Sequence, residues 1–169
     1  MKERRTQIQL RQAVLEDAEM VFQWRNDPFI LVRGSSQRAV QWDEHLKWFE
    51  ETIKGNHRKM FILLKDDYPI GQVRFDCFNE HVCIISAYLL HGFTGKGYGV
   101  DAIRYGCIEV FRLWDIQKVI ACVRYDNVAA RSAFIKAEFV EEHLKDYCPE
   151  AHFVLSLPRS NFISKTEEI

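Results

Sequence analysis

The sequence lacks the features that mark several large classes of protein. Its 23 lysines and arginines face 24 aspartates and glutamates, so the net charge of -1 offers no electrostatic reason to expect a nucleic acid partner. No stretch approaches the roughly 20 apolar residues of a membrane span. The charged start MKERRTQIQL also lacks the apolar centre of a signal peptide. We therefore expect no nucleic acid partner, no membrane association and a cytoplasmic location.

Cysteine is scarce and shows no pairing pattern. The five cysteines are odd in number, contain no CxxC spacing and lie in apolar stretches. This usage favours free buried thiols over disulfides and over a zinc site, so we expect a reducing compartment and no bound metal. The residues concerned are Cys77, Cys83, Cys107, Cys122 and Cys148.

Repeats, long linkers and low-complexity segments are also missing, and there are only four prolines. A chain of 169 residues of which 47% are hydrophobic suits one domain with one core. We place this domain at residues 1–158 and expect a frayed tail at residues 159–169.

Hydrophobic periodicity predicts the secondary structure elements and their order. Alternating runs predict strands, whereas apolar residues at helical spacing predict helices, with 30–41 left as a loop. The expected strands are 7–14, 59–67, 68–78, 81–90, 118–126 and a closing pair over 139–148 and 151–159; the expected helices are 15–26, 42–55, 98–114 and 129–137. This order predicts an α+β fold: a mixed, mostly antiparallel sheet of about seven strands, with helices on both faces.

Three glycines at alternate positions precede the most regular of these helices. Gly95, Gly97 and Gly99 lie in FTGKGYGVDA, at the start of the helix expected over 98–114. A bare backbone at a helix N-terminus presents free N–H groups and the positive end of the helix dipole, which suits a phosphate or pyrophosphate. The spacing matches neither GxxxxGK[ST] nor GxGxxG. A glycine-rich turn without a ligand is the alternative.

The glycine stretch and a later segment together resemble one acetyltransferase superfamily. LLHGFTGKGYGVDA, followed by VRYDNVAARSAFIKAEF, is similar to the signature of the GNAT-type N-acetyltransferases. Gly97 and Gly99 fill its two glycine positions, and Asn127 leads its second helix. Phe134 and Phe139 occupy its aromatic positions. The sequence departs from the signature at three positions, which are Thr94, Ala130 and Glu138.

The resemblance implies acetyl-CoA as the co-substrate. The glycine-turn amides would bind its pyrophosphate, and a splay between two parallel strands would admit its pantetheine arm. The residues so assigned to cofactor binding are Leu89, Leu90, Thr94, Gly95, Lys96, Gly97, Tyr98, Gly99, Asn127, Arg131 and Phe134.

A second resemblance concerns the acceptor. Four N-terminal segments, WRNDP, VR, EHLKWF and PIGQVRFD, look like those of the N-acetyltransferases that modify nucleotide-activated amino sugars. This implies a small-molecule acceptor of the sugar nucleotide class, whose diphosphate Arg74 could bind. Core packing or helix capping is the alternative for most of the assigned residues. They are Trp24, Arg25, Asn26, His45, Trp48 and Arg74.

Direct acetyl transfer in a ternary complex needs a group that accepts the amine proton and a partner for the leaving thiolate. The resemblance places Cys122 and Phe134 where many members have a glutamate base and a tyrosine acid. Asp76 is our candidate base or water-orienting residue, and Tyr88 our candidate thiolate partner.

Two other functions stay open at this point. The acceptor could be a polyamine or a protein N-terminal amine, as in the ribosomal-protein acetyltransferases that the chain also resembles. Alternatively, the protein could bind acyl-CoA without catalysis, as a sensor. A homodimer is also open.

Overall fold

The computed structural model describes residues 8–34, 36–143 and 146–166, with one continuous sheet at its centre. This seven-stranded sheet has the order β1-β2-β3-β4-β5-β7-β6. All neighbouring strands are antiparallel except β4 and β5, which are parallel. The mixed, mostly antiparallel sheet is therefore confirmed. The strands are Ile8–Gln12 (β1), Arg58–Lys65 (β2), Tyr68–Cys77 (β3), Val82–Leu89 (β4), Lys118–Arg124 (β5), Val140–Glu142 (β6) and His152–Pro158 (β7).

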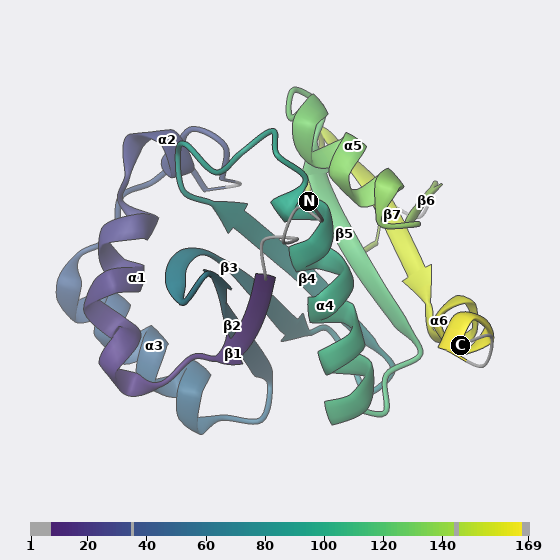
Figure 1. Cartoon of the computed structure of the whole chain (residues 1–169), viewed down its shortest axis with the longest axis horizontal. Helices are drawn as coiled ribbons and strands as arrows, with labels where there is room; N and C mark the ends of the chain where they lie inside the picture. The colour runs from purple at the N-terminus through teal and green to yellow at the C-terminus, as the bar shows by residue number, and fades with distance from the viewer. Residues whose placement is uncertain (1–7, 35, 144–145, 167–169) are drawn as a thin grey trace, which may run out of the picture.

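Helices cover both faces of the sheet, as expected (Figure 1). Helices α4 and α5 pack on one face, which we call the α4 face, and α1 and α3 pack on the opposite, α3 face. The helical elements are η1 (Leu15–Asp17), α1 (Ala18–Arg25), α2 (Pro28–Leu31), α3 (Trp42–Lys54), α4 (Tyr98–Leu113), α5 (Val128–Lys136) and α6 (Arg159–Thr166).

The larger part of the core lies between the sheet and α4. Apolar side chains from alternate positions of β2 to β5 point to this face, among them Val73 and Phe75. A Cβ at Gly106 of α4 would lie only 2.9 Å from Cγ1 of Val73. Gly106 therefore allows α4 to lie unusually close to the middle of the sheet, and with it fixes the position of the helix N-terminus.

The α3 face is covered in two separate parts. Helices α1 and α3 cover its first half, where Phe49 packs against Met60 and Ile62 of β2. Over β4, β5 and β7 the cover is provided by a loop that includes Tyr147 and Cys148. The side chains of β3 between these two covers are partly polar.

This loop overturns the expectation for two of the cysteines. Cys122 of β5 and Cys148 form a disulfide, with their Cα atoms 5.4 Å apart. Cys77, Cys83 and Cys107 are free, as expected. The sequence separation of 26 between Cys122 and Cys148 conceals the pair from any local spacing rule, because α5 and β6 lie between the two cysteines in the chain.

Two segments expected to be irregular contain helices. Pro28 ends α1 as predicted, but it also begins the short helix α2, because proline suits the first helical position and Asp27 accepts a hydrogen bond from the Phe29 N–H. In the tail, Arg159 donates to the carbonyls of Phe111, Trp114 and Ile116 and so anchors α6. The expected frayed tail is thus helical over Arg159–Thr166, and residues 167–169 lie outside the described part.

Candidate active site

Strands β4 and β5 separate part of the way along their length. Their pairing runs from Val82 opposite Lys118 to Ile85 opposite Ala121. Beyond that point β4 continues to Leu89 beside β3, and β5 continues to Arg124 beside β7, without pairing with each other. Each strand therefore presents one free backbone edge to the gap. Unpaired N–H and C=O groups on facing edges can bind an extended ligand that carries amides.

The glycine turn opens the helix that follows β4. Gly95 and Gly97 both have left-handed backbone angles, with φ of 73° and 86°, and Gly97 is the N-cap of α4. A Cβ at either position would meet open space, so the backbone direction rather than crowding demands glycine. The Asp101 N–H bonds to the Gly97 carbonyl at 3.2 Å. Among the described residues, the amides of 94–100 have no hydrogen bond acceptor.

These free amides form an arrangement that is suited to an anion. They lie at the N-terminus of a 16-residue helix, so the helix dipole adds to them. Thr94 and Lys96 are exposed in the same turn, while Tyr98 and Gly99 are half-buried at the start of the helix. Leu89 ends the preceding strand β4, and Leu90 follows it, with its N–H bonded to the Ile70 carbonyl. The turn therefore offers a polyanion several donors on a fixed backbone.

The Asn127 segment supports the opposite side of the gap. The Asn127 side chain caps α5 by accepting a hydrogen bond from the Ala130 N–H at 3.2 Å. Phe134 is buried edge-to-face against Phe139 and belongs to the core. Arg131 pairs with Glu141 of β6 and lies over the ring of Phe153. Asn127 and Phe134 thus hold α5 in place, and Arg131 is already engaged.

A group of arginines surrounds Trp48 on the α3 face. The guanidinium carbons of Arg25, Arg74 and Arg58 lie 4.5, 5.2 and 5.8 Å from the centre of its ring. Asp76 accepts from Arg58 at 2.7 Å and from Arg74 at 2.8 Å, so both of its oxygens are engaged. One carboxylate therefore faces three guanidinium groups.

Arg25 is the unbalanced member of this group. No carboxylate lies within ion-pair distance of it in the part of the chain that the structure describes. Burial, and then the charge of Arg74, lower the pKa of its guanidinium, although the group stays protonated at neutral pH. A half-buried cation beside a second cation creates a site that an anion would stabilise.

Tyr88 lies next to this charged group at the end of β4. Its hydroxyl donates to Oε1 of the buried Gln72 at 3.0 Å. Burial raises the pKa of Tyr88 well above its usual range, against the opposing effect of Arg74 and Arg25. Tyr88 therefore keeps its proton at neutral pH and acts as a hydrogen bond donor.

Three of the residues assigned to the acceptor are structural instead. Trp24 is 9% exposed and packs edge-on against Tyr88. Asn26 uses its whole side-chain amide on Val40, donating to its carbonyl and accepting from its N–H. His45 is fully buried, and its Nε2 bonds to the Ala18 carbonyl at 2.8 Å. These side chains pack or form hydrogen bonds within the layer of α1 and α3, because both helices bury their inner faces.

The burial of His45 predicts a loss of stability in mild acid. Burial, and then the charge of Arg25, lower its pKa, which outweighs the opposing bond to Ala18. The unfolded chain then takes up the proton first as pH falls below about 6.5, so protonation favours unfolding. We expect the free energy of unfolding in urea to fall between pH 7 and pH 5. His45→Gln, which can still donate to Ala18, should reduce this slope; an unchanged slope would contradict the assignment.

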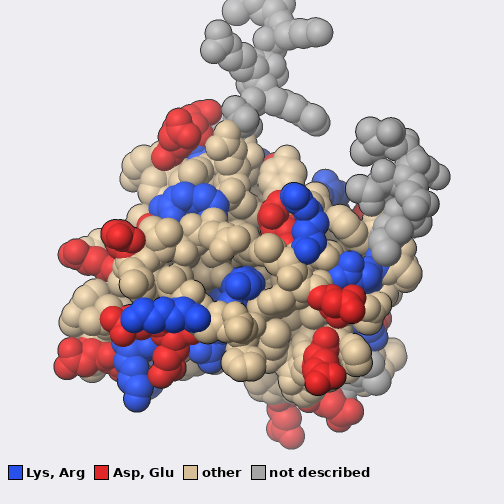
Figure 2. Space-filling view, turned by 90° about the horizontal axis from the view of Figure 1, so that it is seen from below, with Lys and Arg blue, Asp and Glu red and all other residues tan. Residues whose placement is uncertain are grey.

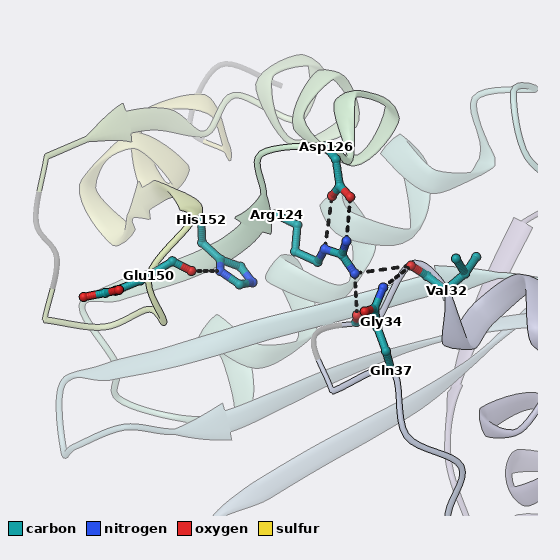
Figure 3. Close-up of polar contacts among 7 residues, drawn as sticks. All are labelled: Val32, Gly34, Gln37, Arg124, Asp126, Glu150 and His152. Carbon is teal, nitrogen blue, oxygen red and sulfur yellow. Dashed lines mark hydrogen bonds and ion pairs between the residues drawn. The ribbon is translucent and has the colours of Figure 1, made fainter.

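Arg124, which the sequence reasoning missed, connects the end of β5 to the segment after α2 (Figure 3). Its guanidinium forms two bonds with Asp126, at 3.0 and 2.5 Å, and also donates to the carbonyls of Val32 and Gly34 at 3.3 Å. Gln37 donates to the same Val32 carbonyl. The Arg–Tyr–Asp sequence at 124–126 could have indicated the pairing of Arg124 with Asp126. The carbonyls that Arg124 also contacts lie about 90 residues away, and no local pattern indicates them.

His152 lies opposite Arg124 in the ladder between β5 and β7 (Figure 3). Its Nδ1 is 2.8 Å from the Glu150 carbonyl, which can only accept, so Nδ1 carries the proton. Its Nε2 is buried and has no partner among the described residues. The sequence placed His152 in the expected strand 151–159 and assigned it no role.

Within the described ranges, no cluster of three or more His, Cys, Asp or Glu side chains could hold a metal ion. Nor does any helix there have the length and apolar character needed to cross a membrane. Acidic and basic side chains alternate over the end of the molecule seen in Figure 2, without a patch of one sign.

Comparisons with known proteins agree on one family. The family model for the acetyltransferase (GNAT) domain matches residues 7–140. Acetyltransferase PseH from two strains of Campylobacter jejuni is similar to the chain. In one strain the identity is 24% over 62% of this chain and 72% of the relative; in the other it is 23% over 78% and 83%.

Solved structures share the fold at lower identity. Aminoglycoside acetyltransferase AAC(6')-Ib with coenzyme A has a TM-score of 0.80 and 17% identity, covering 94% of this chain and 98% of the other. Spermidine N-acetyltransferase from Vibrio cholerae, with coenzyme A and spermine, has a TM-score of 0.79 and 18% identity over 93% and 98%. The chain belongs to the GNAT family and is an acetyl-CoA-dependent N-acetyltransferase.

Proposed function

We propose that this enzyme acetylates the amino group of a nucleotide-linked amino sugar. The observation that carries the proposal is Arg25, a half-buried cation with no carboxylate partner in the described chain, held beside Arg74 over Trp48. A diphosphate would supply the missing negative charge and could accept paired hydrogen bonds from both guanidinium groups.

The donor is proposed to lie across the gap between β4 and β5. The pyrophosphate of acetyl-CoA would bind the free amides of residues 94–100, and the pantetheine arm would run along the free edges of β4 and β5. This brings the thioester toward the point where the strands begin to pair, near Ile85 and Ala121. The acceptor would then approach from the α3 face, where the arginines lie.

The acceptor class follows from charge. A polyamine needs carboxylates around it, whereas this face offers three guanidinium groups against Asp76. The resemblance of the segments around Arg25, Trp48 and Arg74 to amino-sugar enzymes points the same way. Both arguments favour an anionic acceptor over spermidine, the substrate that gives one of the solved neighbours its name.

The proposed chemistry uses a backbone N–H and two side chains near the gap. The acceptor amine attacks the thioester carbonyl directly, and the developing oxyanion is bound by a backbone N–H near the end of β4. Tyr88, protonated at neutral pH, would turn its hydroxyl hydrogen from Gln72 toward the leaving thiolate. Asp76 holds Arg74 and orients water toward the amine, which loses its proton to that water.

A product assay over three classes of acceptor tests this function. Nucleotide-linked amino sugars, polyamines and peptides with free N-termini would each be incubated with acetyl-CoA and a phosphine reductant, with the acetylated product detected by mass spectrometry. We expect turnover with a nucleotide-linked sugar and little with the same sugar lacking its nucleotide. Preferred turnover of a polyamine or peptide would contradict the proposal. Tight acetyl-CoA binding without any product would instead support an acyl-CoA sensor.

A further inference from the structure

We propose that the Cys122–Cys148 disulfide is a thiol-exchange site for coenzyme A, at which the product thiol becomes covalently attached to Cys122. The proposal rests on the binding site for coenzyme A proposed above, in the gap between β4 and β5. It does not depend on which amine is acetylated.

Cys122 occupies the first position of β5 beyond the paired region. Ala121 is the last β5 residue opposite β4, so the backbone of Cys122 borders the gap directly. Its side chain points to the α3 face, the same face as its neighbours Ile120 and Val154. The reacting end of a pantetheine arm in the gap would therefore lie beside the Cys122 sulfur.

Cys148 is the more distant half of the disulfide and lies on the covering loop. This loop contacts the sheet through the disulfide itself, through the Tyr147 carbonyl 3.6 Å from the Cys122 sulfur, and through the Tyr147 ring against Phe78. Both cysteines are half-buried rather than sealed in the core. Cys148 can thus move away with the loop once its bond to Cys122 breaks.

The exchange needs no additional oxidant. The coenzyme A thiolate released by acetyl transfer attacks the Cys122 sulfur, and its electron pair forms the new sulfur–sulfur bond. The bond to Cys148 breaks, and Cys148 leaves as a thiolate that takes a proton from water. One disulfide and one thiol are consumed, and one disulfide and one thiol are formed, so electrons balance.

The other cysteines are poor competitors for the attacking thiol. Each is a free thiol and not a disulfide, so none can exchange with coenzyme A thiol. Burial also raises the pKa of Cys77, Cys83 and Cys107, which keeps them protonated at neutral pH. Attachment should therefore be confined to one position. The attached product would block the next acetyl-CoA until a small thiol removed it.

Intact-mass spectrometry of the whole protein tests the proposal. Protein purified without reductant is first expected to weigh two hydrogens less than the reduced chain, which reports the disulfide. Incubation with coenzyme A should then add the mass of one whole coenzyme A, and peptide mapping should place it on Cys122. Acetyl-CoA, which has no free thiol, should add nothing by itself and should slow the attachment when in excess. Glutathione at equal concentration should react at least tenfold more slowly.

Single variants separate the two halves of the site. Cys122→Ser and Cys148→Ser each lack the disulfide and should gain no coenzyme A, whereas Cys77→Ser should gain it like the wild type. Calorimetry with desulfo-coenzyme A, carried out on all variants, shows whether the coenzyme A binding site itself is intact. Absence of the disulfide would overturn the proposal. So would a protein that binds desulfo-coenzyme A but is not modified by coenzyme A, a coenzyme A attached to Cys148, or equal rates of attachment with glutathione and coenzyme A. Failure of the wild type to bind desulfo-coenzyme A would refute the proposed binding site and with it this inference.

Discussion

Replacing Gly97 by valine is expected to raise the KM for acetyl-CoA between about tenfold and hundredfold. At φ of 86°, Gly97 has a backbone angle that a β-branched residue disfavours by about 1–3 kcal/mol. The turn would relax toward another angle and redirect the free amides that precede α4. Since each 1.4 kcal/mol is about tenfold in affinity, this cost corresponds to about fivefold to somewhat more than hundredfold, which brackets the expected rise. Steady-state kinetics with acetyl-CoA as the varied substrate would measure it.

Gly99→Ala is the matched control for this substitution. Gly99 lies two residues later in the same turn but has no left-handed angle, and its added Cβ would lie 3.8 Å from Cδ1 of Leu89, an ordinary contact. The KM of this variant should stay within about twofold of the wild type, because alanine tolerates the angle at this position, keeps the direction of the amides and makes only an ordinary contact. Similar KM values for both variants would show that the angle at Gly97 does not govern donor binding.

Arg25→Met should lower kcat/KM for an anionic acceptor by about tenfold to hundredfold. A hydrogen bond to a charged group contributes about 1.5–3 kcal/mol, and the variant removes such donors from the acceptor site. Methionine retains part of the apolar contact with Trp48, so packing is disturbed little. The KM for acetyl-CoA should not change, because Arg25 lies on the α3 face, away from the glycine turn. Kinetics with the sugar nucleotide as the varied substrate would measure the effect.

Arg38→Met is the control for loss of charge alone. Arg38 contributes to the field at Arg25, but its side chain is 65% exposed and pairs with Glu44. Exposed ion pairs contribute about 0–1 kcal/mol, so this variant should behave almost as the wild type. Added salt should weaken acceptor binding more in the wild type than in Arg25→Met. If Arg25→Met lowered kcat/KM for an amine without anionic groups as much as for the anionic acceptor, Arg25 would not be the diphosphate ligand.

The regular elements could be predicted because their signals are local. Helix α4 begins at Tyr98, as its apolar spacing indicated, and Asn127 caps α5 at the residue that leads the second motif. Even the departure at Glu138 leaves the geometry intact: with φ of 74°, it adopts the left-handed angle after α5 where the family has glycine. A turn at Asp66 and Asp67 separates β2 from β3, where the expected strands 59–67 and 68–78 met, and aspartates tolerate its left-handed angles.

The acceptor side could be predicted only as a set of candidates. The pattern of residues could not distinguish Arg25, which lacks a carboxylate partner in the described chain, from His45 and Asn26, which are used by the core and by Val40. That distinction depends on which side chains face each other across α1, α3 and β3. Such contacts join residues that are distant in the sequence.

The sequence by itself determined most of the elements and the glycine turn, because hydrophobic period, capping and backbone freedom are properties of neighbouring residues. Its resemblance to the GNAT signature indicated coenzyme A. Only the tertiary structure decided the cysteine pairing, the contact of Arg124 with Val32 and Gly34, and the charge balance around Trp48. These features arise where the chain returns to β5 after α5 and β6, where β5 ends beside the segment after α2, and where α1, α3 and β3 face one another. They depend on distances in space, which no local pattern encodes.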